Sequence, residues 1–206
     1  MHHRPHSQEG TPVARILLLH SAYGLRPAVR AAADRLRTAG HEVHLPDLYD
    51  GRVVDTVEEG MAIKEEIGTE ELLRRAVAVA VPLLGSGSGG LVYAGFSLGG
   101  ALAQNLALAD EGARGLLLFH GTSDILDEAA TGIPVQLHVA EPDPFETEDW
   151  LNAWYLRMRR AGAEVEVHRY HGAGHLFTDP GLPDYDADAA ALAWAAALDF
   201  LTDLDA

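Results

Sequence analysis

Ser97 stands between glycines at a point where the pattern of the chain changes. An apolar run, LVYAG at 91–95, precedes it, and a helix-like pattern follows it. Gly95 and Gly99 lie two residues to either side, where a Cβ atom would obstruct a sharp strand-to-helix turn. In such a turn a serine takes a strained backbone conformation and its hydroxyl points away from the sheet. The spacing therefore favours a nucleophilic serine, and the alternative is an ordinary tight junction.

A serine hydroxyl becomes an effective nucleophile only when a base accepts its proton. The histidines that follow Ser97 are His120, His138, His168, His171 and His175. His138 and His168 fall in predicted strands, which favours packed or edge positions. His120 ends a strand, and we expect it to line the substrate pocket. His171 and His175 both fall in the loop after the last strand, and the small residues of GAGH favour His175 as the base, with His171 as its rival.

The residue that orients the base is expected in the loop AEPDPFE at 140–146, which holds Glu141, Asp143 and Glu146. Asp143 lies between two prolines that restrict the backbone. Aspartate is also common in solvated turns, so position alone does not assign it a role. Together with Ser97 and His175, however, it completes a nucleophile–base–acid set in the order serine, acid, histidine. Glu141 is the second candidate.

Acyl transfer at a serine also needs donors for the negative charge that develops on the carbonyl oxygen. The backbone N–H of Leu98 lies at the predicted positive end of a helix. The loop HSAYGL at 20–25 places the N–H of Ala22 or Tyr23 as the second donor. Ser21 and Tyr23 are expected to contact the substrate. The alternative is a plain strand–helix loop in which His20 caps the strand.

The elements that must position these residues alternate along the chain. Apolar runs predict strands at 13–20, 41–46, 91–95, 115–119, 134–139 and 164–169. Helical patterns occupy 26–40, 55–67, 69–84, 97–110, 146–161 and 186–203. This alternation predicts a mostly parallel sheet of about six strands with helices on both faces. Ligands of such sheets bind beyond the carboxyl ends of the strands, where the candidate residues fall.

Two helices carry apolar stripes that we interpret as core. In 26–40 the stripe comprises Ala28, Ala31, Ala32 and Leu36, and in 186–203 it comprises Ala187, Ala190, Ala191, Trp194, Ala195, Leu198 and Leu201.

The length of 206 residues suits a single α/β domain over 13–206. We expect residues 1–12 to be a frayed polar leader, because they lack the apolar core of a signal peptide. The run GSGSGG at 85–90 is short enough for a loop inside one domain. The first apolar run, 13–19, is too short to span a membrane.

Composition narrows the possible functions. The formal net charge of −16 disfavours nucleic acid and anionic lipid as partners. The chain contains no cysteine, which excludes disulfides, cysteine–zinc sites and a thiol nucleophile, and which fits a cytoplasmic location. We expect a small-molecule substrate and neither a metal nor an organic cofactor. The oligomeric state is left open.

Several segments resemble the dienelactone hydrolase family of α/β-hydrolases. They are the stretch from LLLHSAYGL to PDLYDGR, then AGFSLGGALA, HVAEPDPF and GAGHLF, and together they cover most of residues 13–178. The resemblance implies a minimal α/β-hydrolase fold and a triad of Ser97, Asp143 and His175, with oxyanion donors at Ala22 and Leu98. It also implies a hydrolase of esters, lactones or thioesters.

The chain departs from the best-known members of that family at several points. Those members carry cysteine where this chain has Ser97, and a glutamate where it has Ser21. They also hold the substrate carboxylate with arginines, one of which falls at Asp179 here. Arg26 and Arg52 are expected in loops at the same end of the sheet and are candidates to compensate. Only about twelve polar residues precede the first strand, so a trimmed fold is expected.

Two alternatives in function are carried forward. One is a non-catalytic binding or regulatory protein on a hydrolase scaffold, since a fold does not determine a function. The other is an acyltransferase or perhydrolase that uses the same triad. The short connections at 120–133 and 170–185 predict that no helical cap covers Ser97.

Overall fold

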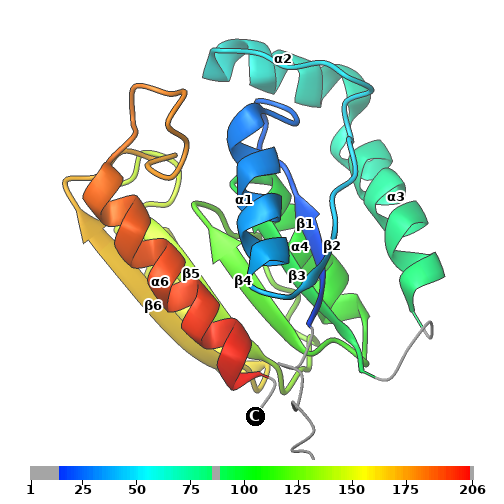
Figure 1. The fold of residues 1–206 in the computed structure, drawn as a ribbon. Coiled ribbons are helices and arrows are strands. Elements are labelled where there is room, and N and C mark those ends of the chain that lie inside the picture. Colours follow the sequence, from blue (N-terminus) through cyan, green and yellow to red (C-terminus); the bar gives the residue numbers. More distant parts are fainter. Residues whose placement is uncertain (1–13, 85–88, 205–206) are drawn as a thin grey trace, which may run out of the picture.

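A computed structural model describes residues 14–84 and 89–204 and contains one six-stranded, fully parallel sheet (Figure 1). The strands are β1 (Arg15–Leu19), β2 (Glu42–His44), β3 (Leu91–Phe96), β4 (Gly115–Phe119), β5 (Pro134–Glu141) and β6 (Glu164–His171). Their order across the sheet is β2-β1-β3-β4-β5-β6. The predicted α/β architecture with a parallel sheet is therefore confirmed.

Helices cover both faces of this sheet. They are α1 (Pro27–Thr38), α2 (Val57–Ile67), α3 (Thr69–Ala80), α4 (Leu98–Ala109), α5 (Glu148–Arg160) and α6 (Ala187–Asp203). Helices α1 and α6 lie on one face, and α3 and α4 lie on the other. Helix α2 lies at the end of the molecule toward which the strands point (Figure 1). Each helix falls within or next to its predicted range.

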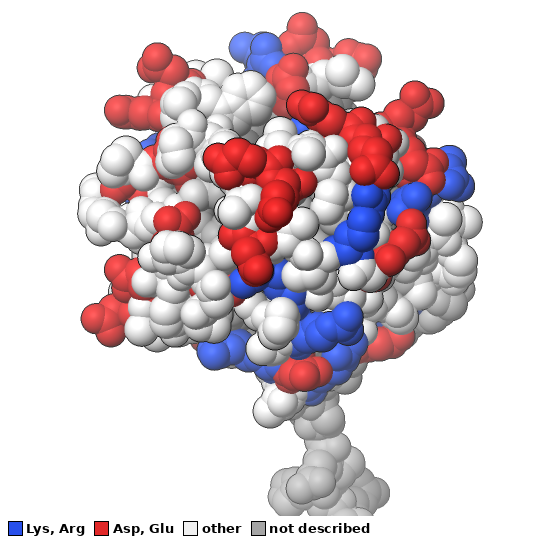
Figure 2. Space-filling view, turned by 90° about the horizontal axis from the view of Figure 1, so that it is seen from above, with Lys and Arg blue, Asp and Glu red and all other residues white. Residues whose placement is uncertain are grey.

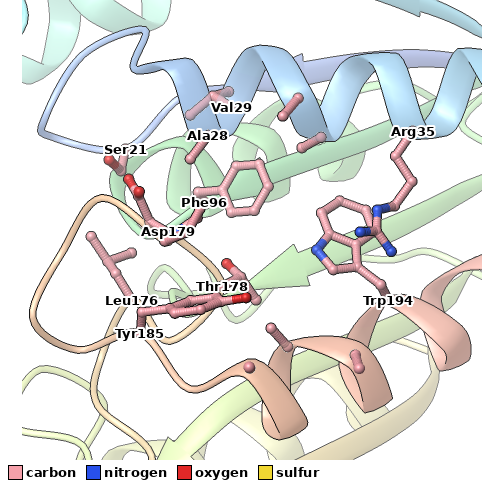
Figure 3. Close-up of a pocket in the computed structure, with 16 residues that line it drawn as sticks. Ser21, Ala28, Val29, Arg35, Phe96, Leu176, Thr178, Asp179, Tyr185 and Trp194 are labelled. Atoms are coloured by element: carbon pink, nitrogen blue, oxygen red, sulfur yellow. The ribbon is translucent and has the colours of Figure 1, made fainter.

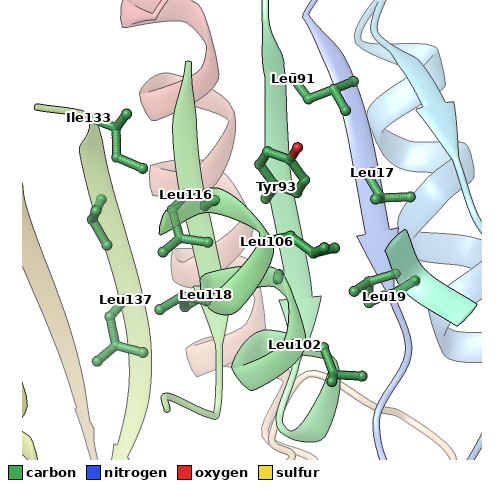
Figure 4. Close-up of a cluster of buried hydrophobic side chains, with 14 of the residues drawn as sticks. Leu17, Leu19, Leu91, Tyr93, Leu102, Leu106, Leu116, Leu118, Ile133 and Leu137 are labelled. Atoms are coloured by element: carbon green, nitrogen blue, oxygen red, sulfur yellow. The ribbon is translucent and has the colours of Figure 1, made fainter. Parts of the chain in front are cut away.

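The core consists of two apolar layers, one on each face of the sheet. Strand β1 shows why, since alternate side chains of a strand point to opposite faces. Leu17 and Leu19 pack toward α3 and α4, as Figure 4 shows, whereas Ile16 and Leu18 pack toward α1 and α6. Strands β1, β3 and β4 need apolar residues at nearly every position because both of their faces are buried.

The ends of several helices follow local sequence signals. The Thr56 hydroxyl accepts a hydrogen bond from the backbone N–H of Glu59 at the start of α2, and Thr147 does the same for Trp150 at the start of α5. Pro27 occupies the first turn of α1, where its missing N–H costs nothing. Helix α3 begins at Thr69 and is preceded by Gly68, which has no side chain to cap it.

The apolar stripes predicted on α1 and α6 are only partly correct. Ala32 and Leu36 on α1, and Ala190, Trp194 and Leu201 on α6, are buried as predicted. However, the remaining buried rows include Val29 and Ala33 on α1, and Ala189, Ala193 and Ala197 on α6, none of which the stripes contained. Ala31, Ala187, Ala191 and Ala195 are exposed instead. Alanine occurs on several sides of both helices, so its hydrophobic signal does not distinguish one row from the next.

The sequence predicted that no helical cap is inserted after β4 or after β6. Residues 120–133, between β4 and β5, and residues 172–186, between β6 and α6, contain no helix. Among the described helices, none is both long and apolar enough to cross a bilayer. The predicted leader at 1–12 and most of the glycine–serine loop at 85–90 lie outside the described residues.

Three histidines are buried in the neutral form. Burial lowers the pKa of His20, lowers that of His120 well below its ordinary value and lowers that of His138 to about 3. The His138 ring lies between Phe119 and His168, at 4.9 Å from each ring centre, and is hydrogen-bonded to Tyr170 Oη. Protonation of any of these rings is therefore much easier in the unfolded chain.

We expect the protein to lose stability on mild acidification. Below about pH 6.5 the unfolded chain binds protons at His120 and His138, whereas the folded chain does not, so the free energy of unfolding falls by roughly 1.4 kcal/mol per pH unit for each of these two, and His20 contributes with the same sign. Urea unfolding at pH 7.5 and 5.5 measures this, above the range in which most carboxylates titrate. A free energy of unfolding that does not vary over this interval would contradict the prediction.

Candidate active site

Ser97 occupies the turn between β3 and α4 in a strained conformation. Its φ is 50° and its ψ is −112°, in a region that residues with a Cβ rarely adopt. The Ser97 backbone N–H donates to the carbonyl of Phe119 on the neighbouring strand at 2.7 Å. This bond anchors the turn, and α4 begins at the next residue, so the hydroxyl lies at the positive end of a helix.

The glycines around Ser97 are required by close backbone contacts. A Cβ atom on Gly95 would lie 2.3 Å from the carbonyl of Gly99, and one on Gly99 would lie 2.3 Å from the carbonyl oxygen of Leu19. A third glycine has the same role, because a Cβ on Gly121 would lie 2.5 Å from Ser97 Cα. Helix α4 can therefore approach the ends of β1 and β3, and the loop after β4 can pass directly beside the serine.

A continuous hydrogen-bonded chain links Ser97, His175 and Asp143. Ser97 Oγ lies 2.9 Å from His175 Nε2, and His175 Nδ1 lies 2.8 Å and 3.0 Å from the two carboxylate oxygens of Asp143. Because the carboxylate accepts from Nδ1–H, Nε2 is free to accept the proton of the serine. The Asp143 side chain is fully buried and that of His175 is nearly so. Residues from three separate loops thus meet as the sequence predicted.

The loop that carries Asp143 is held in place by a second buried carboxylate. Asp143 Oδ1 accepts from the backbone N–H groups of Phe145 and Glu146. The Glu146 carboxylate accepts from the Thr122 hydroxyl at 2.6 Å and the Thr122 N–H at 3.1 Å. Burial raises the pKa of Glu146. The loop after β5 is therefore tied to the loop after β4 next to the triad.

The rival candidates contact one another rather than Ser97. His171 ends β6 with an exposed side chain, and its Nδ1 lies 2.7 Å from Glu141 Oε2. His138 and His168 stack within the sheet, as expected of packed strand residues. The geometry therefore selects His175 over His171 and Asp143 over Glu141.

The loop after β1 presents one of its two candidate N–H groups. The Tyr23 N–H donates to Ser21 Oγ at 3.3 Å, which leaves Ala22 as the better candidate donor. Helix α2 lies against this residue, since a Cβ on Gly60 would be 2.6 Å from the Ala22 carbonyl oxygen. The His20 ring holds this loop in place, because its Nδ1 is hydrogen-bonded to the Ser21 carbonyl and its Nε2 accepts from the Leu48 N–H. Leu98, at the start of α4, supplies the other candidate N–H.

Ser21, Tyr23 and His120, which were predicted to contact the substrate or line its pocket, differ in how far they are exposed. Tyr23 is half-buried, and Ser21 lines a pocket between α1 and α6. His120 is fully buried, with its Nε2 bonded to the Thr178 hydroxyl at 2.7 Å and its ring centre 6.2 Å from that of His175. The expectation that His120 lines the pocket is wrong, because the ring has no exposed surface. It lies behind the His175 ring instead.

The two candidate arginines are each paired with a carboxylate. Arg26 is buried, and it donates to Asp179 at 2.9 Å and to Asp55 at 2.8 Å. It also bonds two backbone carbonyls, so its donors are directed into the protein. Arg52 donates to exposed Glu66 at 2.9 Å. Neither guanidinium is directed at the triad.

Phe145 is a site residue that the sequence reasoning missed. Its ring centre lies 4.6 Å from that of His175, and about half of its surface is exposed. It follows Asp143 by two residues, in a loop from which only the carboxylates were expected to take part in the chemistry. An aromatic residue so close to a candidate acid was the available signal.

Charge around the site is mostly negative. Figure 2 views the molecule from the end where α2 lies, and Asp and Glu side chains are spread over much of this face. Among the described residues, no group of three or more His, Asp or Glu side chains is arranged to hold a metal ion.

Comparison with known proteins places the chain in a family. The sequence matches the dienelactone hydrolase family over residues 1–204. A protein of a Bradyrhizobium species, named as a probable 2-oxo-3-(5-oxofuran-2-ylidene)propanoate lactonase, is 25% identical to it, and the match covers 90% of this chain and 82% of that protein.

Solved structures agree with this match. A dienelactone hydrolase-like promiscuous phosphotriesterase from metagenomic libraries has a TM-score of 0.79 at 25% identity, covering 96% of this chain and 89% of that one. Dienelactone hydrolase from Anabaena variabilis shares the fold, with a TM-score of 0.66 at 22% identity and coverage of 94% and 87%. The chain belongs to the dienelactone hydrolase family of α/β-hydrolases.

Proposed function

We propose that this hydrolase of ester and lactone bonds works through an acyl-enzyme formed on Ser97. The observation that carries the proposal is the hydrogen-bonded chain from Ser97 Oγ through His175 to Asp143. A strained serine at a helix start, with an imidazole 2.9 Å away, is suited to attack a carbonyl carbon. Membership of the family makes the substrate a small molecule.

The geometry supports a two-step reaction. His175 Nε2 accepts the Ser97 proton as Oγ attacks the carbonyl carbon, and the resulting imidazolium is stabilised by Asp143. His175 then returns the proton to the leaving oxygen, and the acyl group remains on Ser97. In the second step His175 takes a proton from water as the water oxygen attacks the acyl carbon, and it gives that proton to Ser97 Oγ as the bond between Oγ and the acyl carbon breaks and the acid leaves. The N–H groups of Ala22 and Leu98 receive the oxyanion in both steps.

A fluorophosphonate probe tests the proposal directly. Such probes react with an activated serine, so we expect intact mass and peptide mapping to locate a single label on Ser97. The matched control is Ser123, whose hydroxyl only accepts from Asn105 and should remain unlabelled. A folded protein that takes up no label would instead support the non-catalytic alternative.

We expect neutral esters or lactones to be better substrates than dienelactone, which is a carboxylate. Arg26 is paired with both Asp179 and Asp55, so these three side chains together carry a net negative charge and offer no free guanidinium to a substrate carboxylate. The measurement is kcat/KM for dienelactone and for a neutral ester. Asp179→Asn removes the charge at nearly constant shape and should narrow the difference. A preference of wild type for dienelactone by about tenfold, or roughly 1.4 kcal/mol, would contradict this expectation.

A further inference from the structure

An open groove of about 260 Å³ runs between α1 and α6 (Figure 3). Its walls are alanines of the two helices, namely Ala28, Ala31 and Ala32 from α1 and Ala187, Ala190 and Ala191 from α6. Phe96 and Trp194, which are both almost fully buried, also line it, as do Asp179 and Tyr185 from the loop before α6. Because alanine side chains are short, the two helices do not fill the space between them.

One end of the groove lies beside the catalytic residues. Among its lining residues, Phe96 directly precedes Ser97, Leu176 directly follows His175, and Ser21 directly precedes Ala22. In Figure 3, Ser21 and Leu176 lie together at one end of the pocket. An apolar chain attached to a carbonyl at Ser97 would therefore enter the groove at this end.

The other end of the groove carries a positive charge. Arg35 lies there beside Trp194, with its guanidinium carbon 5.2 Å from the indole centre (Figure 3). Among the described residues, no carboxylate lies within ion-pair distance of Arg35, in contrast to Arg26, Arg52 and Arg75. A guanidinium held flat against an aromatic ring keeps donors available for an anion.

We propose that the groove between α1 and α6 binds the acyl chain of the substrate, and that Arg35 binds a carboxylate at the far end of that chain. This inference rests on the proposed function. It specifies the substrate class as mono-esters of dicarboxylic acids with about eight carbons, whose second carboxylate is free. The leaving group then lies on the opposite side of the triad, beside Phe145, whose ring packs against His175. His175 is the residue that donates the proton to the leaving oxygen.

The length of the groove sets the length of the chain. Ala28 and Arg35 are seven positions apart on α1, as are Ala187 and Trp194 on α6, which corresponds to about 10 Å along each helix axis. An extended chain of roughly eight carbons, with bonds of about 1.5 Å, has a similar length. A carboxylate at that distance reaches Arg35, whereas the carboxylate of dienelactone stays near Asp179.

Filling the groove tests the chain-binding part. In Ala191→Trp, the ratio of kcat/KM for p-nitrophenyl octanoate to that for p-nitrophenyl acetate should fall by about tenfold, equivalent to roughly 1.4 kcal/mol. Ala195→Trp is the matched control, because Ala195 is exposed on the same helix but does not line the groove, and both values should stay unchanged. An unchanged ratio in a folded Ala191→Trp protein would overturn the assignment.

Removing the charge at the far end tests the carboxylate part. In Arg35→Gln, kcat/KM for the mono-p-nitrophenyl ester of octanedioic acid should fall by about fivefold relative to that for the octanoate ester. Arg30→Gln is the control, since Arg30 is exposed on α1 outside the groove. Equal effects of the two variants would show that Arg35 acts only through the net charge.

A binding measurement separates this inference from the proposed reaction. Titration of folded Ser97→Ala protein with octanedioate by calorimetry requires no catalysis. The proposal that the groove binds the acyl chain is supported if octanedioate binding is lost in the Ser97→Ala, Ala191→Trp double variant and kept in the Ser97→Ala, Ala195→Trp double variant. This holds even if no ester is hydrolysed. Ester hydrolysis that depends on Ser97, combined with no binding and no effect of Ala191→Trp, overturns the groove and leaves the proposed reaction standing.

Discussion

Ser97→Ala is expected to lower kcat for ester hydrolysis by about 10⁴-fold or more while leaving the fold intact. The hydroxyl is the atom that forms the acyl-enzyme, and no other described hydroxyl lies at the end of the His175–Asp143 chain. The hydroxyl makes no hydrogen bond within the described residues other than that with His175, so its loss should hardly alter the free energy of unfolding. The measurements are steady-state kinetics on a short p-nitrophenyl ester and urea unfolding of both proteins.

Ser123→Ala is the matched control for that experiment. Its hydroxyl accepts a hydrogen bond from Asn105, and it takes no part in the triad, so activity should be retained. Activity that persists in Ser97→Ala, after a contaminating hydrolase has been excluded by active-site labelling, would disprove the assignment of the nucleophile.

His175→Ala is expected to lower kcat by about 10³-fold to 10⁴-fold, whereas His171→Ala should change it by less than about twofold. Both histidines follow the last strand, but only His175 lies 2.9 Å from Ser97 Oγ, and His171 is paired with Glu141. Steady-state kinetics of the two variants provide the measurement.

Asp143→Asn and Glu141→Gln form the corresponding pair for the acid. An amide at position 143 no longer favours the Nδ1–H tautomer of His175, so a large loss of kcat is expected there and a small one at position 141. A greater loss in His171→Ala than in His175→Ala, or in Glu141→Gln than in Asp143→Asn, would show that the other members form the triad.

The sequence by itself determined the order of strands and helices along the chain, and the turns and loops whose shape depends on neighbouring residues. Continuous apolar runs such as 115–119 read as buried strands because parallel strands are covered on both faces. The glycines around Ser97 predicted the strained turn, because the turn itself brings together residues that are near in the chain: a Cβ atom on Gly95 would lie 2.3 Å from the carbonyl of Gly99. The loops that hold Asp143 and His175 were identifiable as well, because prolines and glycines mark them in the local sequence.

Tertiary structure decided whatever depends on contacts between distant segments. His171 and His175 lie in similar local sequence, and only the packing of β5 beside β6 shows that His171 meets Glu141. His120 carries the same end-of-strand signal as a pocket residue, yet the loops above it bury it completely. The pairing of Arg26 with Asp179 joins residues 153 positions apart, which no local pattern reports.

The alanine rows of α1 and α6 show the same limit. An alanine stripe has little hydrophobic contrast, so the sequence could not show which row faces the sheet and which faces the other helix. The distance between the two helices is set by the sheet beneath them, and it leaves Ala31 and Ala191 on the walls of a groove rather than in the core. Some residues of the predicted core stripes therefore line the groove between α1 and α6. Whether such an alanine belongs to the core or to the groove depends on how the two helices pack.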